Sequence, residues 1–391
     1  MRYSNRPNRA FRPRTSRVLF VTVGEEAPCP IAASFSARQR PLPVGLVTSD
    51  AGTISSQERA ATIPTPRASM LMNLFGLKYP IFSAGMGYAA GPELAIAVSN
   101  AGGLGAFGTE GNAVADVVRQ RVFQTKSATS RAFAVNYLLA FDPVTLPVAL
   151  DAGAPIIQFA WGIPTRETVA TIRNRGAKMG IQVGSAAGAR RALDLGADYL
   201  ICQGTEAGGH VQATRMLYDA LPAVIEEAKP VPVLAGGGIA SGVHIRRALL
   251  AGASGVLIGT RFVATKEANA HDEYKAAITR ATAADTVLTV CFHDTWPHAP
   301  HRALRNRTFE MWEAAGCPPV GQRPGEGDIL ATNAGTGATK RRYQGSLPVR
   351  DDHGTIAEMA LYAGEGVESI RDIPSANELV ARLWKECLDA G

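Results

Sequence analysis

The chain of 391 residues has no apolar run near the roughly 20 residues that a membrane-spanning helix needs, which argues against an integral membrane protein. Its five cysteines lie far apart and include no CxxC pair. Neither a disulfide framework nor a zinc ribbon is therefore expected, and a reducing, cytoplasmic location is favoured. Aromatic residues make up only 7% of the chain, whereas glycine occurs 40 times, which favours a fold with many tight turns.

The net charge of +6 lies entirely in the first 69 residues, which hold ten arginines, no lysine and four acidic residues. The other 322 residues carry 30 basic and 30 acidic side chains. A neutral folded region lacks the basic surface that binds a phosphate backbone, so we expect no nucleic-acid partner.

Residues 1–69 form a basic leader that we expect to be disordered and dispensable for folding. Its Arg-rich, acid-poor composition also fits a transit-like segment, and Met70 or Met72 is an alternative start of the chain. Pro41, Pro43 and further prolines interrupt any amphipathic helix in its second half, which favours the disordered reading.

From Leu74 onward, short apolar runs alternate with stretches of helical spacing. The expected strands are Pro80–Ala84, Gly103–Phe107, Ala132–Tyr137, Pro155–Ala160, Lys178–Val183, Tyr199–Cys202, Val231–Ala235 and Gly255–Ile258. The expected helices include Pro92–Ala101, Ala113–Thr125, Thr165–Arg175, Ala187–Leu195, Met216–Ala228 and Val243–Ala251. Eight such units predict an α/β fold, a (β/α)8 TIM barrel, at residues 70–283, followed by a C-terminal extension or substrate lid at 284–391. An open Rossmann sheet is the alternative, but no GxGxxG follows the first strand.

Glycines follow the last two expected strands, at Gly236–Gly238 and at Gly259 before Thr260. In TIM barrels these two loops commonly bind phosphate, because glycine lets backbone N–H groups approach an anion. A triple glycine alone would indicate only a tight turn; two clusters at these strand ends favour a phosphate site.

Six motifs occur in an order that resembles one family. They are PIFSAGM at 80–86, GGLG at 102–105, FAVN at 133–136, QGTEAGGH at 203–210, PVLAGGGI at 232–239 and GASGVLIGTRF at 252–262. Together they look like the nitronate monooxygenases, formerly called 2-nitropropane dioxygenases, which are FMN-dependent TIM barrels. The resemblance extends from about residue 74 to about 310, where HRALRN at 301–306 is similar to a family segment near the substrate region.

The resemblance implies FMN as cofactor, and it implies which positions hold it. These are Ala84, Gly85, Met86, Asn136, Gln182, Gln203, Gly208, Gly237, Gly238, Leu257, Ile258, Gly259 and Thr260. Most stand at the expected carboxyl ends of strands, where a TIM barrel carries its active site. A polar residue filling the barrel mouth is the plainer alternative for Asn136 or Gln182 taken singly.

The segment FAWGIP at 159–164 departs from the family pattern, which has a histidine, the presumed catalytic base, where this chain has Ala160. Alanine cannot accept a proton, so direct oxidation of a neutral nitroalkane is in doubt. Oxidation of an already ionised nitronate needs no base and remains open.

His210 is the catalytic candidate, because a similar histidine in flavin-dependent enoyl-ACP reductases is linked to activity. Its ring could donate a proton or a hydrogen bond to a thioester carbonyl; a loop histidine that only orders the backbone is an equal alternative. We expect no metal, because prolines interrupt the histidine-rich run between His293 and His301. Lys178 stands at the start of its strand, which disfavours a Schiff-base enzyme.

Three functions remain open. The first is an FMN-dependent oxidoreductase that consumes alkyl nitronates with O2 and releases nitrite and a carbonyl compound. The second is an NAD(P)H-dependent reductase of enoyl thioesters or quinones, and the third is a flavin-binding protein without turnover. All three bind small molecules, and assembly into a homo-oligomer is left open.

Overall fold

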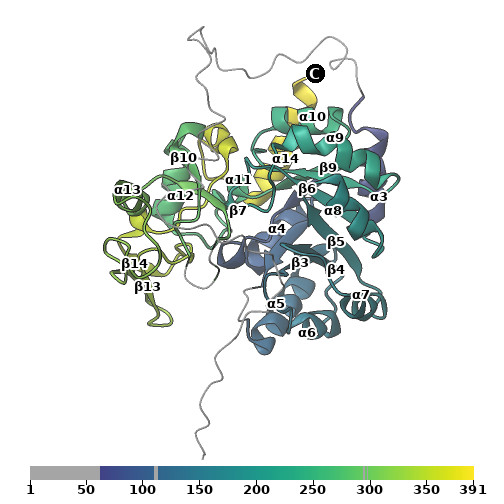
Figure 1. The fold of residues 1–391 in the computed structure, drawn as a ribbon. Coiled ribbons are helices and arrows are strands. Elements are labelled where there is room, and N and C mark those ends of the chain that lie inside the picture. The colour runs from purple at the N-terminus through teal and green to yellow at the C-terminus, as the bar shows by residue number, and fades with distance from the viewer. Residues whose placement is uncertain (1–61, 110–112, 294–295, 297) are drawn as a thin grey trace, which may run out of the picture. The chain divides into compact units, whose positions relative to one another are not determined.

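The computed structural model of the chain describes residues 62–109, 113–293, 296 and 298–391, and Figure 1 shows their arrangement. Up to residue 61, the expected leader lies outside the described residues. Every helix of the described chain is too short or too polar to cross a bilayer.

Eight parallel strands form the central sheet and confirm the predicted barrel. They are β1 (Ile81–Ser83), β2 (Gly105–Gly108), β3 (Phe133–Leu138), β4 (Ile156–Ala160), β5 (Lys178–Val183), β6 (Tyr199–Gln203), β8 (Val233–Gly236) and β9 (Gly255–Ile258). Their order is β1-β9-β8-β6-β5-β4-β3-β2, and a parallel bridge between Phe82 and Leu104 joins the two end strands. Nearly all strand residues are buried, because helices cover the outer face and side chains fill the interior.

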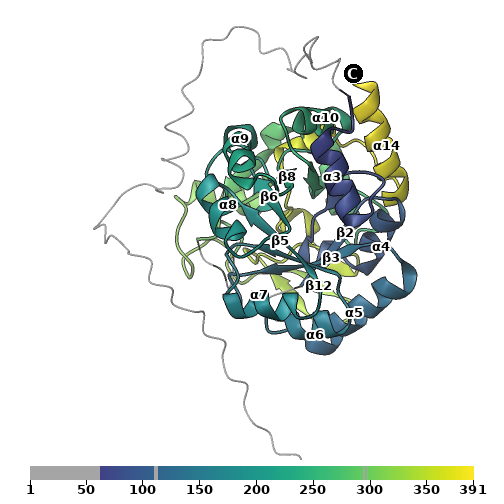
Figure 2. The same ribbon diagram turned by 90° about the vertical axis from the view of Figure 1, so that its right-hand side faces the viewer.

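Helices alternate with these strands and surround the barrel (Figure 2). They are α4 (Pro92–Asn100), α5 (Ala115–Ala128), α6 (Leu146–Asp151), α7 (Arg166–Arg173), α8 (Ala186–Leu193), α9 (Leu217–Ala228) and α10 (Gly242–Leu250). The hydroxyls of Thr165, Ser185 and Ser241 cap α7, α8 and α10 by accepting a backbone N–H of the first turn. All six expected helices are present within three residues of their expected bounds; α6, with six residues, was too short to show a period.

Helix α3 (Pro66–Phe75) covers the amino-terminal end of the barrel and begins inside the expected leader. Thr65 caps it, and Pro66 occupies its first turn, where a proline favours a helix rather than breaking it. Leu71 is fully buried against the barrel interior, and the Phe75 ring lies 5.4 Å from that of Tyr199. The last residues of the expected leader are therefore part of the folded chain.

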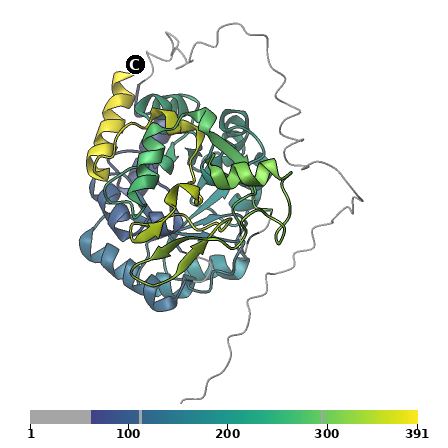
Figure 3. The ribbon, with the colours of Figure 1, turned by 90° about the vertical axis from the view of Figure 1, so that its left-hand side faces the viewer.

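The chain after β9 builds smaller elements, and Figure 3 shows all of them except the C-terminal helix in front of the barrel. Its helices are α11 (Thr260–Val263), α12 (Asp272–Arg280), α13 (Arg307–Ala314) and α14 (Ala376–Asp389). Short strands β10 (Thr286–Thr289) and β11 (His301–Leu304) pair with β7 (Gly209–His210), while β12 (Ile329–Asn333) pairs with β13 (Thr339–Arg341) and β14 (Asp352–Gly354). Short 3₁₀ helices span Ala283–Asp285, Ile356–Glu358 and Glu365–Ser369, and another, Gly87–Ala89, follows β1.

Helix α14 returns to the outer layer of the barrel, where it contacts α10 and α4 (Figure 2). The chain after β9 thus forms elements outside the barrel and then ends in a helix that packs on the barrel's outer layer. The expected domain boundaries at 69/70 and 283/284 stay predictions.

Candidate active site

The carboxyl ends of the parallel strands share one rim, and there the structure brings several expected cofactor residues together. The Ala84 N–H donates to the Ile258 carbonyl, 2.9 Å away, which joins the ends of β1 and β9. A Cβ added to Gly85 would lie 2.6 Å from the Cβ of Asn136, so the turn after β1 lies directly on β3. Only glycine permits that approach.

Asn136 is held in one orientation by buried polar neighbours. Its Oδ1 accepts from Gln158 Nε2 at 3.0 Å, and Gln158 Oε1 accepts from the Tyr199 hydroxyl at 3.2 Å. No residue in the described part of the chain accepts from Asn136 Nδ2, which leaves that donor for a ligand. Gln158 was not among the expected site residues, although a glutamine inside the apolar run of β4 indicates a polar contact within the barrel.

The loops after β8 and β9 present free backbone donors. The N–H groups of Gly237, Gly238 and Ile239 have no acceptor among the described residues, and neither have those of Thr260 and Arg261. Two adjacent loops with unpaired N–H groups can surround an anion. The arrangement fits a phosphate group.

Gly208, after β6, packs directly against the β9 loop. A Cβ there would lie 2.5 Å from the Gly364 nitrogen and 2.9 Å from Thr260 Oγ1. Because Thr260 Oγ1 accepts from the Gly364 N–H at 3.0 Å, its hydroxyl proton stays available to a ligand. Gly364 was not among the expected site residues, since it lies more than 100 residues beyond the last barrel strand.

The side chains of two expected residues, Leu257 and Ile258, lie on opposite faces of β9. Leu257 points into the barrel interior beside the buried Phe82 and Leu234, whereas the Ile258 side chain lies on the outer face, under the helices. Only the backbone of Ile258 reaches the rim. Met86 lies beside the β9 loop, with its sulfur 3.5 Å from the position of a Cβ on Gly259.

A glutamine pair ties the ends of β4, β5 and β6 together. Gln203 Nε2 donates to the His210 carbonyl at 3.1 Å, and its Oε1 accepts from the Gln212 N–H at 2.9 Å. Gln212 in turn donates to the Gln182 carbonyl at 2.8 Å and accepts from the Trp161 N–H at 2.6 Å. The side chain of Gln203 therefore shapes the loop, while the carboxamide of Gln182 bonds to no described residue.

His210 belongs to an aromatic cluster at the mouth. Its ring stacks on Trp296 at 4.5 Å between centroids and lies 5.6 Å from Tyr362 and 6.2 Å from Trp161. Burial lowers the pKa of His210 to about 4, so the ring is neutral at pH 7. No described residue bonds to its ring nitrogens, which leaves them for a ligand.

His301 lies 5.4 Å from His210 across the β7–β11 pair but is engaged on both sides. Its Nε2 accepts from the Phe292 N–H at 3.1 Å, which places the proton on Nδ1, 3.0 Å from the Ala299 carbonyl. Burial lowers the pKa of His301 to about 3. This histidine positions β11, and the described residues contain no group of three side chains able to hold a metal.

The end of β4 carries no base. Ala160 is 6% exposed and opposite Leu138 of β3. The next residue, Trp161, has a left-handed backbone (φ 59°), and its Nε1 is buried without an acceptor in the described chain. A buried donor without an acceptor costs stability, and a ligand that accepts from Trp161 Nε1 would recover that cost.

The loop between β6 and β7 is fixed by a buried arginine. Arg302 of β11 donates to the Thr205 carbonyl at 2.9 Å and pairs with Glu365 at 2.9 Å. Glu206 accepts from the Leu217 N–H through both oxygens at 3.0 Å, and burial raises the pKa of its carboxyl. The segment that carries Gly208 and His210 is thus held independently of a ligand.

Two solved structures have a similar fold. FabK from Thermotoga maritima is 27% identical, with a TM-score of 0.68 over 82% of this chain and 96% of its own. A nitroalkane oxidase from Streptomyces ansochromogenes is 29% identical, with a TM-score of 0.66 over 82% of this chain and 98% of its own.

Sequence comparisons agree with the structural ones. A nitronate monooxygenase of Pseudomonas aeruginosa is 31% identical over 80% of this chain and 97% of its own. The (3aS,4S,5R,7aS)-5-hydroxy-7a-methyl-1-oxo-octahydro-1H-indene-4-carboxyl-CoA dehydrogenase of Mycobacterium tuberculosis is 34% identical over 62% of this chain and 68% of its own. The family model "Nitronate monooxygenase" matches residues 68–145 and 142–386. The chain therefore belongs to the nitronate monooxygenase family of oxidoreductases, whose members are in general flavin-dependent.

Proposed function

We propose that this protein is an FMN-dependent oxidoreductase that oxidises preformed alkyl nitronates with O2 to a carbonyl compound and nitrite. The observation that carries the cofactor assignment is the set of unpaired N–H groups on the β8 and β9 loops. They would hold one phosphate, with Thr260 Oγ1 as a further donor, while Asn136 Nδ2 would reach a polar edge of the ring system. When bound, FMN supplies the electron acceptor for the substrate and the site where O2 is reduced.

The substrate side supports an ionised rather than a neutral substrate. Ala160 offers no proton acceptor, and burial lowers the pKa of His210 to about 4, which makes its neutral ring a weak base. A nitronate arrives without the carbon-bound proton that a base would have to remove. The indole Nε1–H of Trp161 would donate to one oxygen of the nitronate. That oxygen would supply the acceptor that the indole does not have among the described residues.

The test is oxygen consumption by the purified protein with propionate 3-nitronate and with alkyl nitronates, alongside mass spectrometry of the cofactor released by heat. We expect FMN and nitrite-coupled oxygen uptake. Release of FAD, or an inert flavin under these conditions, would contradict the proposal.

A second candidate is an NAD(P)H-dependent reductase of enoyl thioesters or quinones. Its support is the unengaged ring of His210 at the mouth, together with the similarity to FabK and to a dehydrogenase whose name contains a CoA ester. The neutral ring of His210 would then donate a hydrogen bond to the substrate carbonyl.

The substitution His210→Ala separates the two candidates. It should leave nitronate oxidation within about twofold but lower thioester or quinone reduction by about 10²-fold, the smaller end of the cost of removing one hydrogen-bond donor to a developing oxyanion. Rapid mixing of the anaerobic enzyme with NADPH shows whether the second reaction begins at all. The cytoplasmic location remains a prediction.

A further inference from the structure

One continuous C-terminal segment, residues 364–386, touches both loops of the candidate phosphate site. At its start, the Gly364 N–H donates to Thr260 Oγ1 of the β9 loop. Two residues later, a Cβ on Gly366 would lie 2.4 Å from the Gly238 carbonyl of the β8 loop. These close approaches place the backbone of the segment on the two loops at once.

Farther along, Asp372 holds the β9 loop through Arg261. The Arg261 side chain is only 2% exposed, and its Nη1 and Nη2 donate to the Asp372 carbonyl, each at 3.1 Å. Nη2 also bonds to Asp372 Oδ1 at 3.1 Å and to the Ala264 carbonyl at 3.3 Å. Burial lowers the pKa of Arg261 to about 10, an effect that Asp372 opposes. The residue whose N–H belongs to the phosphate site thus depends on Asp372 for its side-chain partner.

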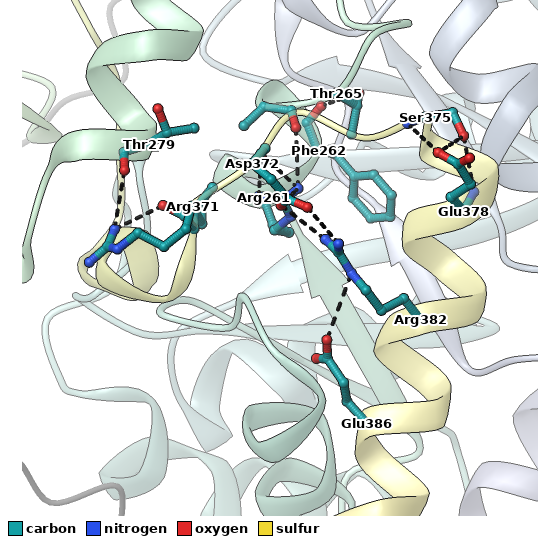
Figure 4. Close-up of polar contacts among 12 residues, drawn as sticks. Arg261, Phe262, Thr265, Thr279, Arg371, Asp372, Ser375, Glu378, Arg382 and Glu386 are labelled. Carbon is teal, nitrogen blue, oxygen red and sulfur yellow. Dashed lines mark hydrogen bonds and ion pairs between the residues drawn. The ribbon is translucent and has the colours of Figure 1, made fainter.

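From the Asp372 carboxylate, a chain of polar contacts leads through Arg382 and Glu386 of α14 to the β8 side (Figure 4). Arg382 donates to both Asp372 oxygens, at 2.5 and 3.0 Å, and its Nε lies 3.7 Å from Glu386 Oε1. Glu386 Oε2 accepts from the Gly242 N–H at 3.0 Å, at the start of α10, directly after the β8 loop. The Arg382 partner holds the pKa of the Asp372 carboxyl below its usual range.

We propose that Asp372, Arg382 and Glu386 form a brace that sets the spacing between the β8 and β9 loops and so determines affinity for the cofactor phosphate. The brace rests on the proposed FMN site. The strands β8 and β9 pair in the barrel as far as Gly236 and Leu257, and beyond these residues the brace is a partner that the two loops share. Preorganised donors bind more tightly than donors that must be ordered during binding. These three side chains are positioning residues, since they act through Arg261 and Gly242.

Charge makes the proposal testable by the sign of the effect. Arg261, Asp372, Arg382 and Glu386 sum to zero formal charge. Removing Asp372 leaves an extra positive charge near the phosphate, which would tighten FMN binding if Coulomb attraction were decisive. The brace predicts weaker binding instead.

The experiment titrates flavin-free, full-length protein with FMN and with riboflavin, following flavin fluorescence. For Asp372→Ala we expect FMN affinity to fall about tenfold or more, because Arg261 loses a charged partner, with riboflavin affinity within about twofold of wild type. Arg382→Lys, which keeps the charge but loses the planar fork, should show a smaller loss of the same selectivity. The matched control is Asp389→Ala, which removes the Lys385–Asp389 pair on the same helix and should change neither affinity.

Each other outcome overturns the brace. Unchanged or tighter FMN binding in Asp372→Ala would show that spacing does not limit affinity. Equal loss for FMN and riboflavin would indicate general loosening of the fold; if Asp372→Ala does not fold, the same criteria apply to Arg382→Lys. Wild-type protein that binds neither flavin would overturn the proposed function itself, and the brace with it.

Discussion

The two halves of the barrel mouth are built from different materials. Around β8 and β9 the site is formed by loop backbone whose N–H groups have no acceptor among the described residues, and ionic side chains bond to these loops. Around β4 and β7 it consists of aromatic side chains, and its histidines are neutral at pH 7 because burial lowers their pKa values.

On the proposed function, the first half holds the cofactor and the second half selects the substrate. A phosphate is a fixed anion that many backbone donors recognise equally well, so that half can be built from glycine. Substrate choice depends on individual side chains, and here one of them, Ala160, lacks the function that the family pattern expects. Changes in one half should therefore leave the other largely intact.

The largest effect should come from the substrate form. We expect wild-type protein to oxidise nitronates about 10²–10⁴ times more efficiently than the neutral nitroalkanes, the usual contribution of a positioned base. Ala160→His should raise activity on the neutral form alone. Steady-state oxygen uptake with freshly dissolved neutral substrate and with pre-ionised substrate measures both.

Ala160→Leu is the matched control, because it adds bulk at the same buried position without a base. It should gain nothing on the neutral form. Equal efficiency of wild type on the two forms would mean that another side chain acts as base, and the contrast between the two halves would lose its chemical meaning.

The next effect concerns the phosphate half. Gly208→Ala would place a Cβ 2.5 Å from the Gly364 nitrogen, and overpacking of this kind costs about 1–3 kcal/mol. FMN affinity should fall about 5–150-fold, while KM for the nitronate, measured at saturating FMN, should stay near wild type. Gly188→Ala in α8, where a Cβ would meet nothing nearer than 3.4 Å, serves as control. Loss of substrate affinity without loss of FMN would reverse the assignment of the halves.

Sequence reasoning anticipated the parts of the fold that depend on local pattern. The bounds of β5 and β9 match the expected strands, because buried parallel strands are short continuous apolar runs. The glycine loops were equally legible, since glycine marks close backbone approaches. Contacts between distant segments could not be predicted. Arg261 and Asp372 lie 111 residues apart, and no local sequence pattern near either residue indicates the other. The stacking of His210 on Trp296 could not be predicted for the same reason. The burial that keeps the His210 ring neutral could not be predicted either.

A smaller effect is expected at the amino-terminal end of the barrel, which α3 covers and which lies away from both halves of the mouth. A chain beginning at residue 62 should fold and bind FMN normally, whereas one beginning at Met70 loses the Thr65 cap and the buried Ala68 of α3. Loss of the cap alone costs about 0.5–2 kcal/mol. Urea unfolding compares the two chains, and the ratio of FMN to riboflavin affinity should be the same in both. A changed ratio would show that α3 influences the phosphate half.

The smallest effect sharpens the substrate half at a single atom. Trp161→Phe removes the buried Nε1–H and keeps an aromatic ring against Trp296, 4.6 Å away in the present structure. Because that donor has no acceptor among the described residues, its removal should raise the free energy of unfolding slightly, whereas a typical buried polar deletion lowers it. If the N–H donates to a nitronate oxygen, kcat/KM should fall about 2–10-fold, the value of one hydrogen bond of about 0.5–1.5 kcal/mol, with FMN affinity unchanged. Urea unfolding and steady-state kinetics on the same preparation test both signs. A less stable variant with unaltered kinetics would show that the indole supports the fold rather than the substrate, and the aromatic half would then owe its selectivity to shape alone.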